Sequence, residues 1–374
     1  MQTEHQIIFQ DARVLDSLAD KSIDLVVTSP PYPMIEMWDT VFTEMAPAIG
    51  TLLNCGDGNG AFEAMHGQLD RVWQELYRVM KDGAVACINI GDATRTIGGC
   101  FQLYANHSRI QQKCFELGFN SLPMVLWRKQ TNAPNKFMGS GMLPGGAYVT
   151  LEHEYILILR KGGKRKFLTA AEKARRLRSS YFWEERNVWF SDLWDFKGAR
   201  QDLKKPGLRG RSAAYPIELP FRLINMYSLI GDTVFDPFLG MATTTLAALA
   251  TGRHSIGYEI DTRFSDAVSR RIEAEAPELA SLNKKRINSH KDFVERYSID
   301  KGELKHFNHF FNFPVITGQE RELRLAFLKR VEKVNSNHYR AAYFEEQDIP
   351  GNGSGQLTQE LSLTGDKEKQ QTLF

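Results

Sequence analysis

Short runs of consecutive apolar residues alternate along this chain with longer segments in which apolar side chains recur every three or four positions. The short runs are typical of strands buried on both faces of a parallel sheet, and the periodic segments are typical of amphipathic helices. The runs predict strands at residues 5–11, 22–29, 84–90, 121–127, 153–160, 231–238 and 254–261. The periodic segments predict helices at residues 69–80, 109–118, 217–229, 243–252 and 321–334. Because strands and helices alternate, the pattern predicts an α/β fold with a doubly wound, mostly parallel sheet.

Three segments lack this periodicity. Residues 128–152 are rich in Gly, Pro and Asn, which predicts a mobile loop between two strands. The glycine-rich stretch Gly56–Gly60 follows no predicted strand, so we interpret it as a flexible loop over the site and not as a phosphate-binding turn. From residue 350 onward the chain is polar and rich in Gly, Ser and Gln, which predicts a disordered tail.

The overall composition is that of a globular protein with a sizeable core, since 42% of its 374 residues are hydrophobic and 25% are charged. No apolar run is long enough to span a membrane, and the N-terminus does not resemble a secretory signal. The four cysteines are scattered, so we expect a reducing cytoplasmic location without a disulfide framework. His153-Glu154 begins like a zinc-binding motif, but Leu157 stands where the second histidine belongs, so no metal site is predicted.

Positive charge is concentrated in one part of the chain. The formal net charge is only +2, but Arg160–Arg211 contains sixteen Lys and Arg against six Asp and Glu. Such a basic segment on an otherwise acidic chain favours a localised contact with a polyanion. The same segment contains eight aromatic residues, so it is also consistent with a small solvated subdomain whose aromatic side chains form their own core.

A candidate ligand site follows the strand that ends near Asp236. The sequence Val-Phe-Asp-Pro-Phe runs into the loop Leu239–Ala242 and then into a helix that opens on Thr243. A helix N-terminus offers free N–H groups and the positive end of its dipole to an anion. Glu259 ends the next strand, 23 residues after Asp236, at the spacing of an acid that binds ribose hydroxyls. The loop lacks the glycine pattern of dinucleotide sites, and taken alone the segment is also consistent with an ordinary strand–helix turn.

A second candidate site is the tetrapeptide Ser29, Pro30, Pro31 and Tyr32, which follows the strand that ends at Thr28. The two prolines remove backbone donors and fix φ, which leaves rigid carbonyl oxygens at the end of the strand. Tyr32 then presents an aromatic face. Because such a tetrapeptide can also be a strand-ending turn, its significance depends on the first candidate site.

Together these segments resemble the amino-group DNA methyltransferases of the circularly permuted class, in which the catalytic motif precedes the cofactor motif. The resemblance covers about residues 5–262. Ser29–Tyr32 matches the catalytic motif, Asp236–Gly240 matches the cofactor loop, and Tyr258-Glu259 matches the ribose-binding acid. One departure is Ala242, because the family loop usually has glycine at this position.

The resemblance implies S-adenosylmethionine as the cofactor and assigns residues to it. Asp11 stands where the family places an acid near the adenine, and residues 212–219 are similar to the segment that touches the methionine end. The catalytic residues implied are Ser29, Pro30, Pro31 and Tyr32. The cofactor-binding residues implied are Asp11, Thr28, Pro216, Asp236, Pro237, Phe238, Gly240, Thr243 and Glu259.

The resemblance also implies a domain organisation with an inserted recognition region. The segments expected are a catalytic half at 1–160, a basic target-recognition insert at 161–211, a cofactor-binding half at 212–300, a C-terminal helical extension at 301–349 and a disordered tail at 350–374.

An exocyclic amine is a poor nucleophile because its lone pair is delocalised into the base. Acceptors placed out of the plane of the base draw the amine toward tetrahedral geometry, and the Ser29 hydroxyl and the Pro30 carbonyl are the candidates. The target atom lies inside the duplex, so the base has to be flipped out, and Tyr32 is expected to stack on it.

Serine at the first motif position is typical of family members that methylate cytosine N4, whereas Asp or Asn is typical of adenine N6 enzymes. The resemblance therefore implies cytosine N4, with adenine N6 as the alternative. Double-stranded DNA is the expected partner, together with a cognate restriction nuclease that cuts the same site. Two further hypotheses stay open: a methyltransferase of similar fold that acts on RNA or protein, and a non-catalytic relative that has lost cofactor binding at Ala242.

Overall fold

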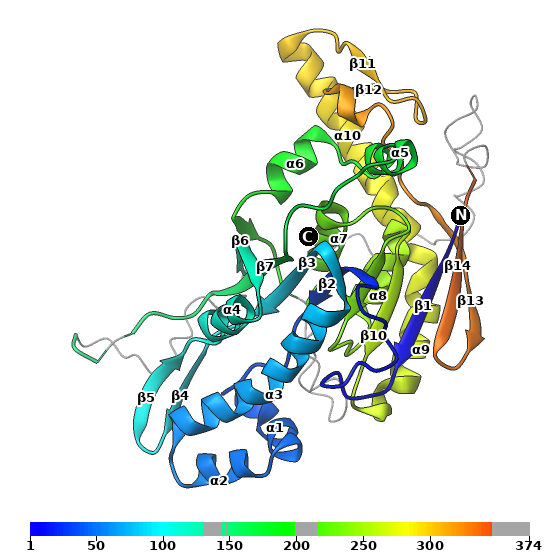
Figure 1. Ribbon diagram of the computed structural model, residues 1–374. Coiled ribbons are helices and arrows are strands. Elements are labelled where there is room, and N and C mark those ends of the chain that lie inside the picture. The colour runs from blue at the N-terminus through cyan, green and yellow to red at the C-terminus, as the bar shows by residue number, and fades with distance from the viewer. Residues whose placement is uncertain (130–143, 147, 199–214, 346–374) are drawn as a thin grey trace.

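The computed structural model describes residues 1–129, 144–146, 148–198 and 215–345. Ten of the strands in this part of the chain form one sheet: β1 (Gln2–Ile8), β2 (Ile23–Thr28), β3 (Met80–Ile90), β6 (Phe119–Arg128), β7 (His153–Lys161), β8 (Leu193–Asp195), β9 (Thr233–Asp236), β10 (His254–Tyr258), β13 (Leu328–Asn335) and β14 (His338–Tyr343). Their order across the sheet is β13-β14-β1-β10-β9-β2-β3-β7-β6-β8 (Figure 1).

The five central strands of the sheet, β1, β10, β9, β2 and β3, run parallel to one another. Their last residues therefore lie at one end of the sheet, the carboxyl end, and their first residues lie at the opposite, amino end. β7 runs antiparallel to β3, so it starts at the carboxyl end with His153 and finishes at the amino end with Lys161. The predicted α/β fold with a mostly parallel sheet is confirmed.

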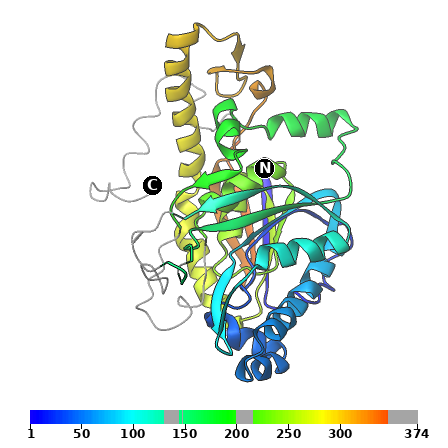
Figure 2. The ribbon, with the colours of Figure 1, turned by 90° about the vertical axis from the view of Figure 1, so that its left-hand side faces the viewer.

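Helices cover both faces of this sheet (Figures 1 and 2). α3 (Gly58–Val79) and α4 (Asn106–Glu116) pack in one hydrophobic core, and α7 (Glu218–Tyr227), α8 (Thr243–Thr251) and α9 (Ser265–Glu275) pack in the other. All six residues of β2 are buried, with Leu25 and Val27 in one core and Val26 in the other. Burial on both faces explains why this strand reads as a continuous apolar run in the sequence.

The predicted strands and helices overlap elements of the same type, with the exception of the helix at 321–334. The stretch Gly56–Gly60 also differs from its prediction as a flexible loop. Asp57 is the N-cap of α3, its side chain accepts a hydrogen bond from the backbone N–H of Gly60 at 2.8 Å, and the helix begins at Gly58. Asp57 is a favoured N-cap residue and so indicated the start of a helix, but the glycines around it led to the prediction of a loop.

The predicted C-terminal helical extension at 301–349 is wrong. α10 (Ala280–Lys301) ends where that extension was expected to begin, and the chain continues through β11 (His306–Phe307), β12 (Pro314–Val315) and the β13–β14 hairpin. In β14, Tyr339, Ala341 and Tyr343 are buried at alternate positions, which is the period of a strand. β14 pairs antiparallel with β1, so the hairpin covers an otherwise open edge of the parallel sheet.

Smaller elements extend from the two ends of the sheet. Near the bottom of Figure 1 lie α1 (Asp39–Met45), α2 (Ala48–Asn54) and the hairpin of β4 (Ala93–Ile97) and β5 (Cys100–Tyr104), and near the top lie α5 (Ala170–Arg178) and α6 (Trp183–Trp189). Among the described residues, no helix combines the length and hydropathy that a membrane span requires. Most of the predicted loop at 128–152 and the whole predicted tail at 350–374 lie outside the described residues.

Candidate active site

The carboxyl ends of β1, β2, β9 and β10 converge on a cavity of about 470 Å³, which we call the central cavity. In parallel α/β sheets this is the end at which ligands bind. Loops after β1 and β2, the start of α8 and parts of α1 and α3 complete its walls. Nine of the residues predicted from the sequence line it: Asp11, Ser29, Pro30, Pro31, Pro237, Phe238, Gly240, Thr243 and Glu259.

Two other predicted cofactor residues, Thr28 and Asp236, are buried next to the cavity and do not line it. The Asp236 carboxylate accepts hydrogen bonds from Thr28 Oγ1 at 2.6 Å and from Thr244 Oγ1 at 2.8 Å. It also accepts from the backbone N–H of Phe238 at 3.1 Å and from the hydroxyl of Tyr215 at 3.3 Å. Burial raises the pKa of Asp236 even though these donors oppose the shift. With four donors in place, Asp236 anchors the loop that follows β9 and does not line the cavity. The half-buried Pro216 does not line it either.

The Glu259 carboxylate lines the cavity with both oxygens held by the backbone. Oε2 accepts from the N–H of Gly240 at 2.9 Å, and Oε1 accepts from the N–H of Asp261 at 2.9 Å. Each carboxylate oxygen has a further lone pair, so Glu259 can also accept hydrogen bonds from hydroxyl groups of a ligand. Burial raises the pKa of Glu259.

Asp11 lines another part of the same cavity. Its carboxylate accepts hydrogen bonds from the backbone N–H of Arg13 at 2.9 Å and from Arg13 Nε at 2.7 Å. Burial raises the pKa of Asp11, but the contacts with Arg13 outweigh it and hold the pKa below its usual value. Arg13 also donates to Gln68 Oε1 at 2.6 Å, which fixes the acid against α3.

The loop between β9 and α8 contains a strained residue at the position where the sequence departs from the family pattern. Ala242 is the N-cap of α8 and has φ 62° and ψ 32°, in the left-handed region that glycine adopts more easily. No side chain caps this helix, so N–H groups of its first turn remain for a ligand. Arg271 donates to the carbonyl of Met241 at 2.8 Å and to Thr243 Oγ1 at 2.9 Å, one on each side of Ala242.

The tetrapeptide after β2 is part of a buried hydrogen-bond network. Ser29 Oγ donates to the Tyr32 hydroxyl at 3.1 Å, and that hydroxyl donates to Glu154 Oε2 at 3.0 Å. Asn89 Nδ2 donates to both the Tyr32 oxygen at 2.9 Å and Glu154 Oε2 at 2.7 Å, and Lys129 forms an ion pair with Glu154 Oε1. Burial raises the pKa of Tyr32, so its hydroxyl stays protonated.

The position of Tyr32 in this network differs from its predicted role as a residue that stacks on the flipped base. Its side chain is only 8% exposed and does not line the central cavity, so in this structure its ring presents no open face for stacking. The sequence prediction missed Asn89, Lys129 and Glu154. For Glu154 there was a signal, because a carboxylate beside the apolar run Tyr155–Leu159 is unusual for a buried strand.

Comparison with known proteins identifies the family. A family model described as DNA methylase, of the N6/N4 type, matches residues 23–270 of the chain. The chain belongs to this DNA methylase family. It is 49% identical over 347 residues to the Type II methyltransferase M.MthZI of Methanothermobacter thermautotrophicus, a match that covers 92% of this chain and 96% of that protein. It is 48% identical over 281 residues to the Type II methyltransferase M.MjaI of Methanocaldococcus jannaschii, covering 72% and 91%.

Among solved structures, this methylase resembles a putative DNA modification methylase from Thermus thermophilus in complex with S-adenosyl-L-methionine. The TM-score is 0.56 at 32% sequence identity, and the match covers 73% of this chain and 96% of that one. The predicted family of amino-group DNA methyltransferases and the Rossmann-like methyltransferase fold are confirmed, and the protein is a DNA methyltransferase. Its assignment to the circularly permuted class stays a prediction.

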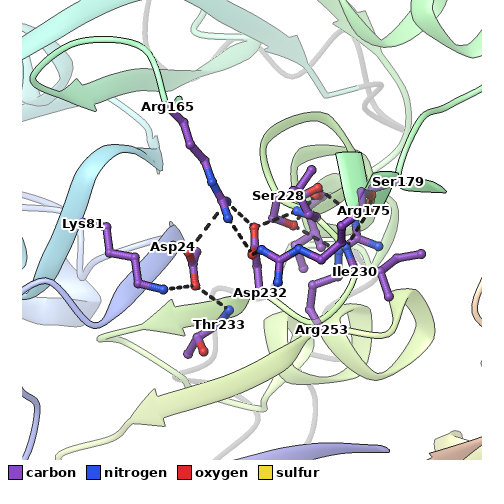
Figure 3. Close-up of polar contacts among 12 residues, drawn as sticks. Asp24, Lys81, Arg165, Arg175, Ser179, Ser228, Ile230, Asp232, Thr233 and Arg253 are labelled. Carbon is purple, nitrogen blue, oxygen red and sulfur yellow. Dashed lines mark hydrogen bonds and ion pairs between the residues drawn. The ribbon is translucent and has the colours of Figure 1, made fainter. Parts of the chain in front are cut away.

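The basic segment of the methylase, predicted at 161–211, lies partly away from the central cavity. Lys161 ends β7 at the amino end of the sheet and donates to the carbonyls of Tyr77 and Met80. Arg165 and Arg175 reach Asp232 in a cluster at that same end (Figure 3). β8 then returns toward the carboxyl end, parallel to β6, and residues 199–214 lie outside the described part of the chain. The role of the segment in DNA recognition stays a prediction.

Proposed function

We propose that this DNA methyltransferase transfers a methyl group from S-adenosylmethionine to the exocyclic amine of a base flipped out of double-stranded DNA, and that the acceptor is cytosine N4. The observation that carries the proposal is the position of Ser29. Ser29 lines the central cavity, and its hydroxyl is hydrogen-bonded to Tyr32. A hydroxyl at the first position of the motif supplies the acceptor that an amine nucleophile needs.

The central cavity fits the cofactor in size and in chemistry. Its volume of about 470 Å³ lies within the range of roughly 300–1,000 Å³ that small-molecule sites occupy. Glu259 would accept hydrogen bonds from the ribose hydroxyls, and the N-terminus of α8 with Thr243 would receive the carboxylate of the methionine end. When bound, S-adenosylmethionine supplies a methyl group already activated by its sulfonium, so the main task of the protein is alignment.

The chain's own residues would orient the amine. Ser29 Oγ and the carbonyl of Pro30 accept hydrogen bonds from the two N–H groups of the target amine, which turns its lone pair out of the plane of the base. Pro30 and Pro31 hold this part of the backbone rigid because both have fixed φ. After transfer, the methylated amine is cationic and strongly acidic, so it releases one of its protons to water.

Cytosine is favoured because the motif begins with the small neutral side chain of Ser29 instead of Asp or Asn. Expression of the protein in a host without DNA methylation, followed by digestion of its DNA to nucleosides and mass spectrometry, tests this assignment. N4-methylcytosine is the expected product. N6-methyladenine as the sole product would replace cytosine with the alternative target, and 5-methylcytosine would contradict the amine mechanism itself.

A cognate restriction nuclease is the partner we propose, because two relatives that match most of this chain are described as Type II methyltransferases. Plasmid DNA from cells that express the protein should resist one or more nucleases of a panel with different recognition sites. Sequencing of the modified bases then gives the recognition sequence. Cleavage by every nuclease whose site contains a modified base would speak against a protective role.

A further inference from the structure

A buried carboxylate stands behind the Ser29–Tyr32 tetrapeptide. Glu154, the second residue of β7, is 9% exposed and touches three hydrogen-bond donors. The Tyr32 hydroxyl and Asn89 Nδ2 contact its Oε2 at 3.0 and 2.7 Å, and Lys129 contacts its Oε1. None of these three partners is adjacent to Glu154 in sequence, so the fold assembles the group at the carboxyl end of the sheet, where β3 finishes and β7 starts.

The direction of each hydrogen bond in this network follows from the chemistry of the groups. An ionised carboxylate only accepts, and an ammonium group only donates. The Tyr32 hydroxyl has one hydrogen, and at 3.0 Å from Glu154 Oε2 that hydrogen has to lie between the two oxygens. The opposite arrangement would set a lone pair of Tyr32 against a carboxylate in a buried site, which is strongly unfavourable.

Asn89 reinforces this direction. Its Nδ2 group supplies one hydrogen to the Tyr32 oxygen and one to Glu154 Oε2. The flipped amide would place its oxygen against the carboxylate, so the network selects the orientation in which nitrogen faces Glu154. Tyr32 thus donates to Glu154 and accepts from Asn89, which leaves it only an accepting role toward Ser29.

Ser29 therefore donates its single hydrogen to Tyr32, at 3.1 Å. The lone pairs of the Ser29 oxygen then remain for other donors, and the residue lines the central cavity. A serine hydroxyl in isolation rotates and serves as donor or acceptor. A chain of hydrogen bonds that ends on a carboxylate removes that ambiguity.

We propose that Glu154 is a positioning residue that, through Tyr32, fixes the Ser29 hydroxyl as a hydrogen-bond acceptor for the amine of the target base. This inference rests on the proposed function and deepens it. An aspartate or asparagine oxygen at the first motif position can only accept a hydrogen bond. A serine hydroxyl can donate or accept, and its bond to Tyr32 leaves it only an accepting role toward the amine. This arrangement also gives Tyr32 a role through its hydroxyl while its ring stays buried.

The first test is Glu154→Gln, which keeps the size of the side chain but adds a donor. Its amide can donate to the Tyr32 oxygen, so Tyr32 becomes free to donate to Ser29 and to occupy the lone pair meant for the amine. Single-turnover methyl transfer to duplex DNA should slow by about ten- to hundredfold, the range of one hydrogen bond lost at the transition state. Cofactor and duplex dissociation constants should change by less than about twofold, since Glu154 is buried and does not line the central cavity.

The second test, Tyr32→Phe, keeps the ring and removes the hydroxyl that links the network. It should slow transfer by a similar factor, and the double variant should be no slower than the slower single variant, because both changes break the same chain. Full activity of Glu154→Gln, or of Tyr32→Phe, would overturn the inference, and so would losses that multiply in the double variant. These outcomes require an active wild-type protein. A wild type that forms no amino-methylated base would instead refute the proposed function.

Discussion

The two ends of the parallel sheet hold polar clusters of opposite design. At the amino end, Asp232 is 2% exposed and accepts hydrogen bonds from Arg165 and Arg175, while Asp24, at 6% exposure, pairs with Lys81 (Figure 3). Backbone N–H groups add further donors, from Leu229 to Asp232 and from Thr233 to Asp24. These carboxylates are fully engaged by cations and backbone groups, so the cluster joins the basic segment to the sheet.

At the carboxyl end, Glu259 and Ser29 are held by neutral groups and keep lone pairs for a ligand. Backbone N–H groups of Gly240 and Asp261 hold Glu259, and Ser29 donates to a tyrosine. Both residues line the central cavity. Charged residues therefore serve structural attachment where opposite charges compensate each other, and they serve binding where an acceptor keeps lone pairs for a ligand.

The largest expected effect is the loss of stability when the amino-end cluster is broken. Asp232→Asn removes the carboxylate that pairs with Arg175 and leaves Arg165 with only Asp24, at 3.6 Å, as an acidic partner among the described residues. We expect it to lower the free energy of unfolding by about 3 kcal/mol, the lower end of the range for a broken buried pair, because both arginines are partly exposed. Urea denaturation measures this change. The matched control is Asp82→Asn, which breaks the exposed pair with Lys21 at 2.7 Å and should leave the midpoint of urea denaturation almost unchanged.

Cofactor affinity should be unchanged in folded Asp232→Asn, because the residue lies at the opposite end of the sheet from the central cavity. A weakened affinity at a temperature where the variant is folded would show that the two ends are coupled. Equal losses of stability for the two variants would remove the distinction between the buried cluster and an exposed ion pair.

The next effect in size is on the ligand side of the comparison. Glu259→Ala should weaken binding of S-adenosylmethionine by about 1.5–3 kcal/mol, the worth of hydrogen bonds to a charged acceptor. Because burial raises the pKa of Glu259, wild-type affinity should also decline on acidification at a higher pH than an exposed glutamate would require. Calorimetry as a function of pH measures both changes. Unchanged affinity in the variant would mean that the cofactor lies elsewhere.

Much of the fold could be predicted from the sequence because β2, β3 and α3 carry their burial pattern locally, in runs and periods of apolar residues. The C-terminal hairpin could not be predicted in this way. Residues 321–334 have apolar positions at helical spacing, but β14 gains its stability by pairing with β1, more than 300 residues earlier in the chain. The alternation of Tyr339, Ala341 and Tyr343 was the local clue.

The candidate site was predictable where a motif itself lines the cavity, as for Ser29 and Glu259. Motifs do not reveal which residues touch a ligand and which support others. Asp236 is bonded to Thr28, 208 positions away, and serves as an anchor. Glu154 acts on Tyr32 across 122 positions, so its partner exists only in the folded chain.

A smaller effect concerns the DNA surface. If the flipped base enters the central cavity, exposed cations at the carboxyl end contact phosphates and those at the amino end do not. The double variant Arg128→Gln with Lys197→Gln should weaken binding to any duplex sequence by about tenfold and reduce the slope of log K against log salt by about 2. The matched variant Lys166→Gln with Lys173→Gln, in the basic segment near the amino end, should leave both quantities within error.

This pair of variants also decides the role of the basic segment. Equal losses of affinity in the two double variants would mean that DNA reaches both ends of the sheet. A loss confined to Lys166→Gln with Lys173→Gln would move the DNA surface to the amino end and contradict the proposed entry of the base.

The smallest effect is expected at Ala242, where glycine would restore the usual family residue. Glycine at φ 62° relieves about 1–2 kcal/mol of backbone strain, but it forfeits the burial of one methyl group, about 0.8 kcal/mol, and adds about 0.4–1 kcal/mol of unfolded-state entropy. These contributions nearly cancel, so Ala242→Gly should change the free energy of unfolding by less than about 1 kcal/mol.

Arg271 holds the carbonyl of Met241 and the hydroxyl of Thr243 in both variants, so the loop should keep its shape and cofactor affinity should stay within about twofold. Calorimetry and urea denaturation of the two proteins measure both quantities. A tenfold gain in affinity for Ala242→Gly would mean that the methyl group of Ala242 obstructs the cofactor.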